Sequence, residues 1–446
     1  MTEKALSISR LSTSAADFES RLQTHLQREM LVAEELSRTV AEIIADVRQR
    51  GDAALLDYSN RFDGFAASSM DDLVVSQEQL QLALDSIPES QRQALSHAAE
   101  RIRRYHEKQK QSSWHYEEAD GSVYGQKVSP LERVGVYAPG GKANYPSSVL
   151  MLAIPAQVAG VKEIIATVPT KFSEAGYLVF AAAALAGVDR VYSLGGAQAI
   201  AALAYGSETL PAVDKITGPG NAYVTMAKKQ VYGDVGIDML AGPSELTVIC
   251  DGETDPDWIA MDLFSQAEHD EQAQSILIST SESFLNQVED SINRLLPSMD
   301  RRAIITQSLE SRGIFILADD LAAAARASNL IAPEHLELSV ADPEALVELI
   351  DHAGAIFMGR YSAEALGDYC AGPSHVLPTS GSARFFSALG VYDFQKRSSI
   401  INCSAVGANK LAATASELAR NEHLQAHALS AEYRLNPELG PESQDS

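Results

Sequence analysis

Two side chains that can bind a metal ion lie one helical turn apart in the segment SQAEHD, residues 265–270. Asp255 and Pro256 are typical of the N-cap and the first residue of a helix. A helix that begins there places Gln266 and His269 on one face. An imidazole and a carboxamide oxygen side by side can hold a divalent cation, although a carboxamide is a rare zinc ligand. Taken alone, the pair is better explained as an ordinary surface helix end.

An acid and an imidazole stand next to each other further along the chain, in Pro333-Glu334-His335. The proline predicts that they lie at the start of an element. Adjacent residues share neither a helix face nor a strand face, so we expect Glu334 and His335 to serve different sides of a reacting group, such as a water and a hydroxyl. In isolation, the segment is more simply a solvated turn.

Two more candidate segments follow towards the C-terminus. Residues 367–375, GDYCAGPSH, are too rich in Gly and Pro for a helix interior, and they predict a loop in which Asp368 and His375 can contact a ligand. Glu422 and His427 flank an apolar residue in a helical, Ala-rich tail, where a single His is more often a surface residue. No one of these segments identifies a site by itself.

Together, the segments resemble the histidinol dehydrogenase family. The resemblance runs from roughly residue 10 to residue 435, and it is carried in order by ERVGVYAPGGKANYPSSVLM, GGAQAIAALAYG, ITGPGNAYVTMAKKQV, IDMLAGPSEL, SQAEHD, APEHLEL, EALGDYCAGPSHVLPT, RFFSALGVYDFQKRSS and EHLQAH. So many long motifs in one order are a far more specific signal than any one of them.

The resemblance implies a zinc site. The zinc ligands would be Gln266, His269, Asp368 and His427. An amide oxygen, two imidazoles and a carboxylate, with no thiolate, suit a catalytic zinc that leaves room for substrate. The resemblance also implies that the substrate contacts the four ligands together with Ser244, His335 and Glu422.

The implied reaction is a zinc-requiring, NAD-dependent, four-electron oxidation of L-histidinol to L-histidine through histidinaldehyde, the last steps of histidine biosynthesis. His335 would accept a proton in both oxidations, because imidazole titrates near neutrality. Glu334 would activate the water that hydrates the aldehyde. The hydride chemistry would belong to the nicotinamide.

The dinucleotide site cannot be found from a fingerprint. No GxGxxG follows a predicted strand, and the glycine turns at 139–141, 195–196 and 218–221 are, by themselves, ordinary strand-to-helix turns. The resemblance implies that NAD binds without the usual fingerprint, through Tyr137, Gln198 and Asn221. These three residues stand at the ends of predicted parallel strands, where open sheets bind ligands.

Composition is that of an intracellular enzyme without nucleic-acid or membrane partners. Acidic residues outnumber basic ones 60 to 35, for a formal net charge of −25, and such a field repels nucleic acid and anionic membranes. Three cysteines without CxxC spacing fit a reducing compartment, and the N-terminus has no apolar signal segment. No apolar run is long enough to span a bilayer. We therefore expect a cytoplasmic location.

The pattern along the chain is α/β. Helices are predicted over 12–60 and 75–112. Short β-branched runs predict strands at 134–137, 164–168, 191–194 and 215–217 in one set, and at 246–250, 275–279, 314–317 and 355–358 in another. The expected fold is two incomplete Rossmann-like parallel-sheet domains with helical N- and C-terminal extensions. No internal repeat is visible in the sequence.

The expected domain limits are an N-terminal helical arm (1–30), a Rossmann-like domain for substrate and zinc (31–136 with 244–389), a second for NAD (137–243) and a C-terminal helical tail (390–446). Glu422 and His427 lie in that tail, whose apolar positions are Leu411, Leu418, Leu424 and Leu429. The resemblance implies an intertwined homodimer in which the tail completes the partner's site. A tail that folds back on its own chain is the alternative.

Three other functions stay open. The chain could be a related zinc- and NAD-dependent dehydrogenase of another amino alcohol or of a sulfonated diol. A zinc hydrolase would use similar ligands, but it would not need three glycine turns, and the sequence has no HExxH. A non-catalytic metal-binding or scaffold protein gives no reason for adjacent Glu334 and His335.

Overall fold

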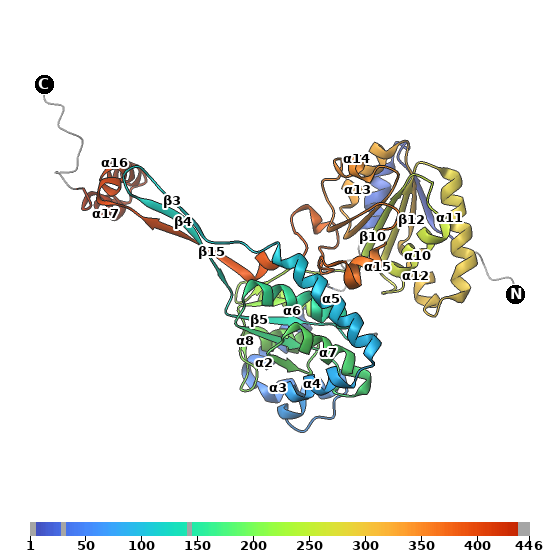
Figure 1. Ribbon diagram of the computed structural model, residues 1–446, viewed down its shortest axis with the longest axis horizontal. Helices are drawn as coiled ribbons and strands as arrows, with labels where there is room; N and C mark the ends of the chain where they lie inside the picture. The colour runs from blue at the N-terminus through green and yellow to red at the C-terminus, as the bar shows by residue number, and fades with distance from the viewer. Residues whose placement is uncertain (1–5, 28–32, 141–144, 436–446) are drawn as a thin grey trace. The chain divides into compact units, whose positions relative to one another are not determined.

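The computed structural model of the protein describes residues 6–27, 33–140 and 145–435 (Figure 1). The chain divides into two compact units, Met1–Gln109 with Leu131–Phe394, and Lys110–Pro130 with Gln395–Ser446. The first unit contains two sheets of mostly parallel strands, and the second contains an antiparallel sheet and the C-terminal helices. The first unit therefore provides the two parallel-sheet layers that the sequence predicted.

The sheet that carries the glycine turns, here called sheet one, has the strand order β2-β7-β6-β5-β8-β9. Its strands are β2 (Val74–Val75), β5 (Arg133–Tyr137), β6 (Glu163–Thr167), β7 (Arg190–Tyr192), β8 (Lys215–Thr217) and β9 (Gly236–Ile237). Neighbouring strands are parallel except β2 and β7. The order β7-β6-β5-β8-β9 follows the 3-2-1-4-5 order of a Rossmann fold, whose switch point lies between β5 and β8.

Helices cover sheet one. Its crossover helices are α6 (Pro146–Ala159), α7 (Tyr177–Ala186), α8 (Gly196–Tyr205) and α9 (Ala222–Val231). The N-terminal helices of the same layer are α2 (Ala33–Arg50), α3 (Asp52–Tyr58), α4 (Gln77–Ser86) and α5 (Glu89–Glu107). α6 and α7 are apolar almost all round, because α4 and α5 pack on the side that solvent would otherwise reach.

Sheet two has the order β1-β12-β11-β10-β13-β14, and all its strands are parallel. Its strands are β1 (Ser9–Ser12), β10 (Glu245–Cys250), β11 (Gln274–Ser279), β12 (Ile314–Leu317), β13 (His335–Ser339) and β14 (Ala355–Met358). Its helices are α1 (Phe18–Leu26), α10 (Pro256–Ala267), α11 (Glu282–Leu295), α12 (Arg302–Arg312), α13 (Leu321–Ile331), α14 (Pro343–Val347) and α15 (Glu364–Leu366). β10 and β11 are buried at every position, as expected for a parallel sheet with both faces covered.

The two sheets share one topology. β12-β11-β10-β13-β14 repeats the 3-2-1-4-5 order of sheet one, and each sheet gains one short N-terminal strand beside its third strand. The switch point of sheet two, at the carboxyl ends of β10 and β13, is filled by Arg360. Its guanidinium donates hydrogen bonds of 2.9 Å to Asp251, 2.7 Å to Thr254 and 3.3 Å to the backbone oxygen of Ser339. The usual ligand crevice of this sheet is therefore occupied by the protein itself.

The second unit is a three-stranded antiparallel ribbon with two helices packed on each other. β4 (Val123–Pro130) pairs with both β3 (Trp114–Glu117) and β15 (Gln395–Asn402). α16 (Ala405–Asn421) and α17 (Gln425–Glu432) follow, and Arg420 of α16 donates a 2.6 Å hydrogen bond to Glu432 of α17.

The sequence predicted the strands better than the domain limits. Each of the eight predicted strands has a counterpart, and the fold class is confirmed. Three assignments differ. β5 and the helices from α2 to α5 join sheet one, not the domain of 244–389, because α4 and α5 pack on α7 and α6. The expected helical arm 1–30 contributes an edge strand to sheet two. The expected helical tail 390–446 begins with a short 3-10 helix, Val391–Phe394, and β15 follows it.

Candidate active site

Glu334 and His335 lie at the amino-terminal end of sheet two, where β10 and β13 begin side by side. His335 is the first residue of β13. Its Nδ1 lies 3.0 Å from the backbone oxygen of Glu245, and the Glu334 carboxylate accepts a 2.9 Å hydrogen bond from the Glu245 N–H. Both side chains are buried, so they do not belong to a solvated turn.

The two side chains lie close together, and their service to different sides of a reacting group stays a prediction. Glu334 Oε2 lies 3.8 Å from His335 Nδ1. Glu334 precedes the strand, so the alternation of faces within a strand does not apply to it. The acid and the imidazole therefore share one buried environment.

Two further carboxylates approach the His335 ring from the segment after β14. Glu364 begins α15, and its Oε1 lies 3.6 Å from His335 Nδ1. Asp368 lies in a π-helical turn, Gly367–Ala371, where a loop had been predicted, and its Oδ1 lies 3.5 Å from His335 Nε2. The ligand atoms of these three residues lie within 4.8 Å of one another, close enough to hold a metal ion.

Gln266 and His269 stand where the sequence placed them, at the end of α10. Asp255 caps the helix and accepts a 2.9 Å hydrogen bond from Asp257 N–H. His269 follows the last turn, and its N–H donates a 3.2 Å bond to the backbone oxygen of Gln266. Gln266 is fully buried, and in the described part of the chain neither polar atom of its carboxamide has a hydrogen-bond partner. Burying a carboxamide without partners is costly, so Gln266 is expected to contact a ligand.

Charges and burial oppose each other in this cluster. Burial raises the pKa of Glu334 to about 8 and that of Glu364 to about 8. Burial works against the charged form of His335, yet the carboxylates of Glu364, Glu334 and Asp368 outweigh it and raise the pKa of His335 well above its ordinary value. His335, Glu334 and Glu364 therefore hold protons at a pH at which they would release them in water.

The pKa values of Asp368 and His269, in contrast, are lowered. Burial raises the pKa of Asp368, but the contacts with His335, His375 and His269 outweigh burial and lower it overall. Burial lowers the pKa of His269, against a smaller opposing effect of Asp368. A carboxylate that stays ionised and an imidazole that stays neutral are in the protonation states that bind a metal ion.

His375 joins the Asp368 turn to the helices of sheet one. Its Nδ1 lies 2.9 Å from the backbone oxygen of Asp368, and its Nε2 lies 3.2 Å from Ser148 Oγ on α6. Arg101 of α5 donates a 2.7 Å hydrogen bond to the backbone oxygen of Cys370 in the same turn. The π-helical turn is thus held from both sheets of the first unit.

The three residues predicted to bind NAD lie at the carboxyl end of sheet one. Tyr137 ends β5, Gln198 lies in the first turn of α8 after β7, and Asn221 is the N-cap of α9 after β8. Tyr137 Oη accepts a 3.2 Å hydrogen bond from Gly196 N–H. Asp63 joins this group and accepts a weak, 3.4 Å bond from Gln198 Nε2.

The other predicted substrate contacts lie in different places. Ser244 precedes β10, so it stands at the same sheet end as Glu334 and His335, and it is half-buried. Glu422 and His427 belong to the second unit, where both are exposed. Their roles in the site stay predictions.

Comparison with known proteins gives the family. A family model described as histidinol dehydrogenase matches residues 26–435. The chain is 64% identical over 428 residues to a histidinol dehydrogenase of Pseudomonas aeruginosa, with 96% of this chain and 97% of the relative covered. It is 60% identical over 430 residues to that of Dechloromonas aromatica, with 96% and 99% covered. The chain belongs to the histidinol dehydrogenase family.

A solved structure agrees with this family assignment. The crystal structure of histidinol dehydrogenase from Elizabethkingia anophelis matches with a TM-score of 0.90 and 34% identity, and the match covers 97% of this chain and 99% of that one. Members of the family are dehydrogenases, so the chain is an oxidoreductase. Across the residues that the structure describes, no helix has the length and apolar character needed to cross a membrane.

Sequence reasoning missed two buried acids at the site, Glu364 and Glu337. Glu364 lies inside a segment that carries the family resemblance, yet nothing about its type or spacing singled it out. Glu337 is two residues after His335 on β13, so strand alternation could have placed it on the His335 face. Its carboxylate accepts a 2.7 Å hydrogen bond from Glu364 N–H. An acid two residues after His335 was the sequence signal that could have located Glu337.

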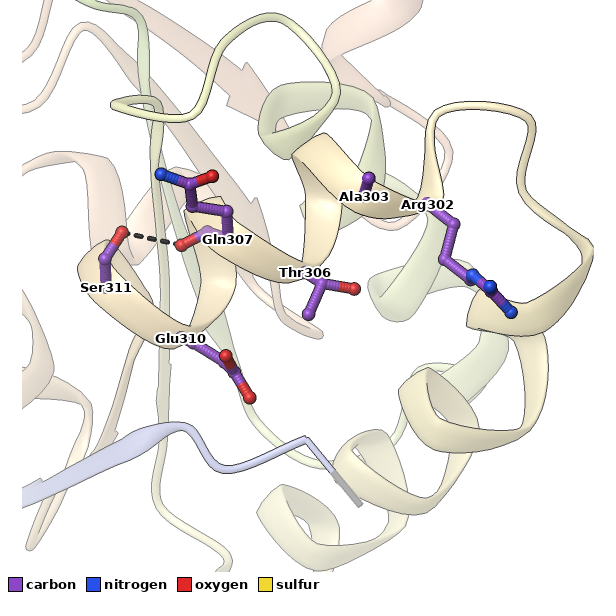
Figure 2. A pocket seen from close by; sticks show the side chains of 6 residues that line it. All are labelled: Arg302, Ala303, Thr306, Gln307, Glu310 and Ser311. Carbon is purple, nitrogen blue, oxygen red and sulfur yellow. Dashed lines mark hydrogen bonds between the residues drawn. The ribbon is translucent and has the colours of Figure 1, made fainter. Parts of the chain in front are cut away.

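The site does not coincide with the large pocket on α12. Figure 2 shows that pocket, of about 540 Å³, whose lining residues are Arg302, Ala303, Thr306, Gln307, Glu310 and Ser311. All six belong to one helix, and none is near the His335 cluster in sequence or shared with it. A hollow on one helix face, without buried polar groups of its own, offers no chemistry that compares with the cluster at β13.

Proposed function

We propose that the protein catalyses the NAD-dependent, zinc-requiring, four-electron oxidation of L-histidinol to L-histidine through histidinaldehyde, the last steps of histidine biosynthesis. Family membership supports the reaction. The observation that carries the proposal within the structure is the buried His335 imidazole, whose Nε2 faces Asp368 and has no good hydrogen-bond partner in the described part of the chain. Such an atom is available to a substrate hydroxyl.

The donor set fits a zinc ion. The proposed ligands are Gln266, His269, Asp368 and His427. The buried Oε1 of Gln266 and Oδ1 of Asp368 both lack hydrogen-bond partners among the described residues, as expected of atoms that meet a cation. When bound, zinc would supply a fixed positive charge that orients the imidazole and amine of the substrate.

A second set, His335 with Glu364 and Asp368, is also close enough for a metal ion. We favour the first set because His335 is needed as a base. The Nδ1 of His335 lies at hydrogen-bond distance from the Glu245 carbonyl, which can only accept, so Nδ1 carries the proton. In the neutral ring the lone pair is then on Nε2, the atom that can take the hydroxyl proton.

Glu334 is proposed to activate the water that the second oxidation consumes. One of its oxygens is fixed by the Glu245 N–H, and burial keeps its affinity for protons high. A carboxylate that is held in place and binds protons near neutral pH is suited to accept one from water. Ser244, which precedes β10 at the same sheet end, is proposed to contact the substrate.

NAD is proposed to bind at the carboxyl end of sheet one, through Tyr137, Gln198 and Asn221. Support comes from their position around the switch point between β5 and β8, the usual ligand position of such sheets. The corresponding position in sheet two is filled by Arg360. Sheet one is therefore the better dinucleotide site.

We further propose a homodimer with shared active sites, in which Glu422 and His427 act in the partner's site. The C-terminal helices present apolar side chains that a monomer leaves exposed. Leu418 is 59% and Leu411 50% exposed on α16, and Leu424, between the helices, is 42% exposed. Apolar positions of this kind are covered when two copies associate. The free thiols of Cys250, Cys370 and Cys403 support a cytoplasmic location.

The test is NADH formation on adding NAD and L-histidinol, combined with elemental analysis of the purified protein. Two NADH per histidinol and stoichiometric zinc are expected. Oxidation of a sulfonated diol in place of histidinol would identify the protein as the related dehydrogenase of sulfonated diols. Full activity in metal-free protein would refute the zinc site.

A further inference from the structure

A lysine and an aspartate form a buried ion pair against the glycine turn that follows β8. Lys228 is on α9, Asp238 follows β9, and their side chains are 2% and 1% exposed. The turn, Gly218-Pro219-Gly220-Asn221, is called the Gly218 turn below. Neither charged group takes part in the chemistry proposed above.

The pair holds both polar backbone groups of Gly218. Lys228 Nζ donates a 2.8 Å hydrogen bond to the Gly218 carbonyl, and Asp238 Oδ2 accepts a 2.7 Å bond from the Gly218 N–H. Gly218 has a φ of 120°, and a Cβ there would lie 2.1 Å from the backbone oxygen of Tyr137. The ion pair therefore fixes a conformation that only glycine can adopt, against the end of β5.

The Gly218 turn is also the segment that presents Asn221. Asn221 Oδ1 accepts hydrogen bonds of 3.0 Å from Tyr223 N–H and 3.2 Å from Val224 N–H, which caps α9. Its Oδ1 is thus committed to the helix, and its Nδ2 is the group left to donate to a ligand. Where Nδ2 points depends on the conformation of the turn.

A buried ion pair is an unusual way to stabilise a core, because apolar residues of similar volume often serve equally well. Here both charged groups hydrogen-bond the backbone of one residue, Gly218, at the switch point of sheet one. We propose that Lys228 and Asp238 are positioning residues, which hold the Gly218 turn in the conformation that binds the dinucleotide. This inference rests on the proposed use of NAD at sheet one.

The experiment compares wild type with Lys228→Met and with the double variant Lys228→Met/Asp238→Asn, which leaves no unpaired buried charge. For each protein the KM for NAD, the KM for histidinol, kcat, the affinity for NAD by calorimetry and the melting temperature are measured. Because small displacements of positioning groups weaken ligand geometry strongly, the KM and Kd for NAD should rise on the order of 10- to 100-fold. The KM for histidinol should change by less than about two-fold.

Lys215→Met is the matched control. Lys215 begins β8, the strand whose other end leads into the Gly218 turn, and it forms a half-buried ion pair with Asp393 at 3.4 Å. Its loss should lower the melting temperature without changing the affinity for NAD. A KM for NAD that rises equally in the control would point to general loosening of sheet one and would overturn the proposal.

The outcomes distinguish a failure of the proposed function from a failure of the positioning role of Lys228 and Asp238. If wild type neither binds NAD nor reduces it with histidinol, the proposed function fails whatever the variants do. If wild type does both, and a folded variant without the pair binds NAD as tightly, the positioning role is refuted. If both variants lose their fold, the pair serves the whole domain rather than the turn, and the proposal is equally refuted.

Discussion

Replacing Glu334 by Gln should separate the two oxidations. The amide is isosteric and keeps an oxygen that can accept the 2.9 Å hydrogen bond from Glu245 N–H, so the backbone at the start of β10 stays in place. What is lost is a proton acceptor for water. Loss of a general base costs about 10²–10⁴ in rate, which corresponds to about 3–5 kcal/mol of barrier. We expect that loss in the oxidation of histidinaldehyde only.

At low pH, Glu334→Gln should oxidise histidinol faster than wild type does, in contrast to its slower oxidation of histidinaldehyde. Glu334 is one of the carboxylates that raise the pKa of His335, so its neutralisation lowers that pKa. His335 must be neutral to accept the hydroxyl proton, and a lower pKa keeps it neutral in more acidic solution. The acid limb of the pH profile for histidinol oxidation should therefore move to lower pH, with the plateau rate unchanged.

The assay follows single-turnover NADH formation from histidinol and, separately, from supplied histidinaldehyde. Glu344→Gln, an exposed acid on α14, is the control and should leave both rates unchanged. Equal slowing of the two oxidations in Glu334→Gln would refute the assignment of this carboxylate to the water. An acid limb that moves to higher pH would refute the electrostatic link to His335.

Three other outcomes are expected. His269→Ala should lose bound zinc by elemental analysis while Glu364→Gln retains it; the reverse result would favour the ligand set built around His335. Equal amounts of the dead variants His335→Ala and His427→Ala, unfolded and refolded together, should recover roughly a quarter of wild-type activity, since half the dimers are mixed and each has one intact site; no recovery would place each site within one chain. Burial raises the pKa of Asp63 to about 6, so its contribution to stability is complete in acid and is lost as the pH rises through 6. Asp63→Asn should consequently melt higher relative to wild type at pH 7 than at pH 4, and a constant difference in melting temperature would contradict this.

Local sequence was sufficient for some of the elements around the site, such as β11 and α10. Buried β-branched runs such as Ser275–Ser279 predicted strands, because a parallel sheet covered on both faces needs apolar residues at successive positions. Asp255 and Pro256 predicted the start of α10, and the helix period then placed Gln266 and His269 one turn apart. These inferences involve residues a few positions apart, so the chain's own geometry settles them.

The strand that carries His335 was not predicted. β13 reads His-Leu-Glu-Leu-Ser, with polar residues at alternate positions that are all buried. The buried Glu337 carboxylate accepts a hydrogen bond from Glu364 N–H, from a segment 27 residues later. The sequence contains both residues but no sign that they meet.

The sequence by itself determined the family, the α/β class, most strands and the residue types of the site. Only the tertiary structure decided that the cluster lies at the amino end of sheet two, that Glu364 and Asp368 converge on His335, and that both sheets share one strand order. It also decided that Arg360 fills the switch point of sheet two. The physical reason is that each of these facts depends on contacts between residues tens to hundreds of positions apart. Their geometry follows from strand register and helix packing, which the local periodicity of a sequence does not encode.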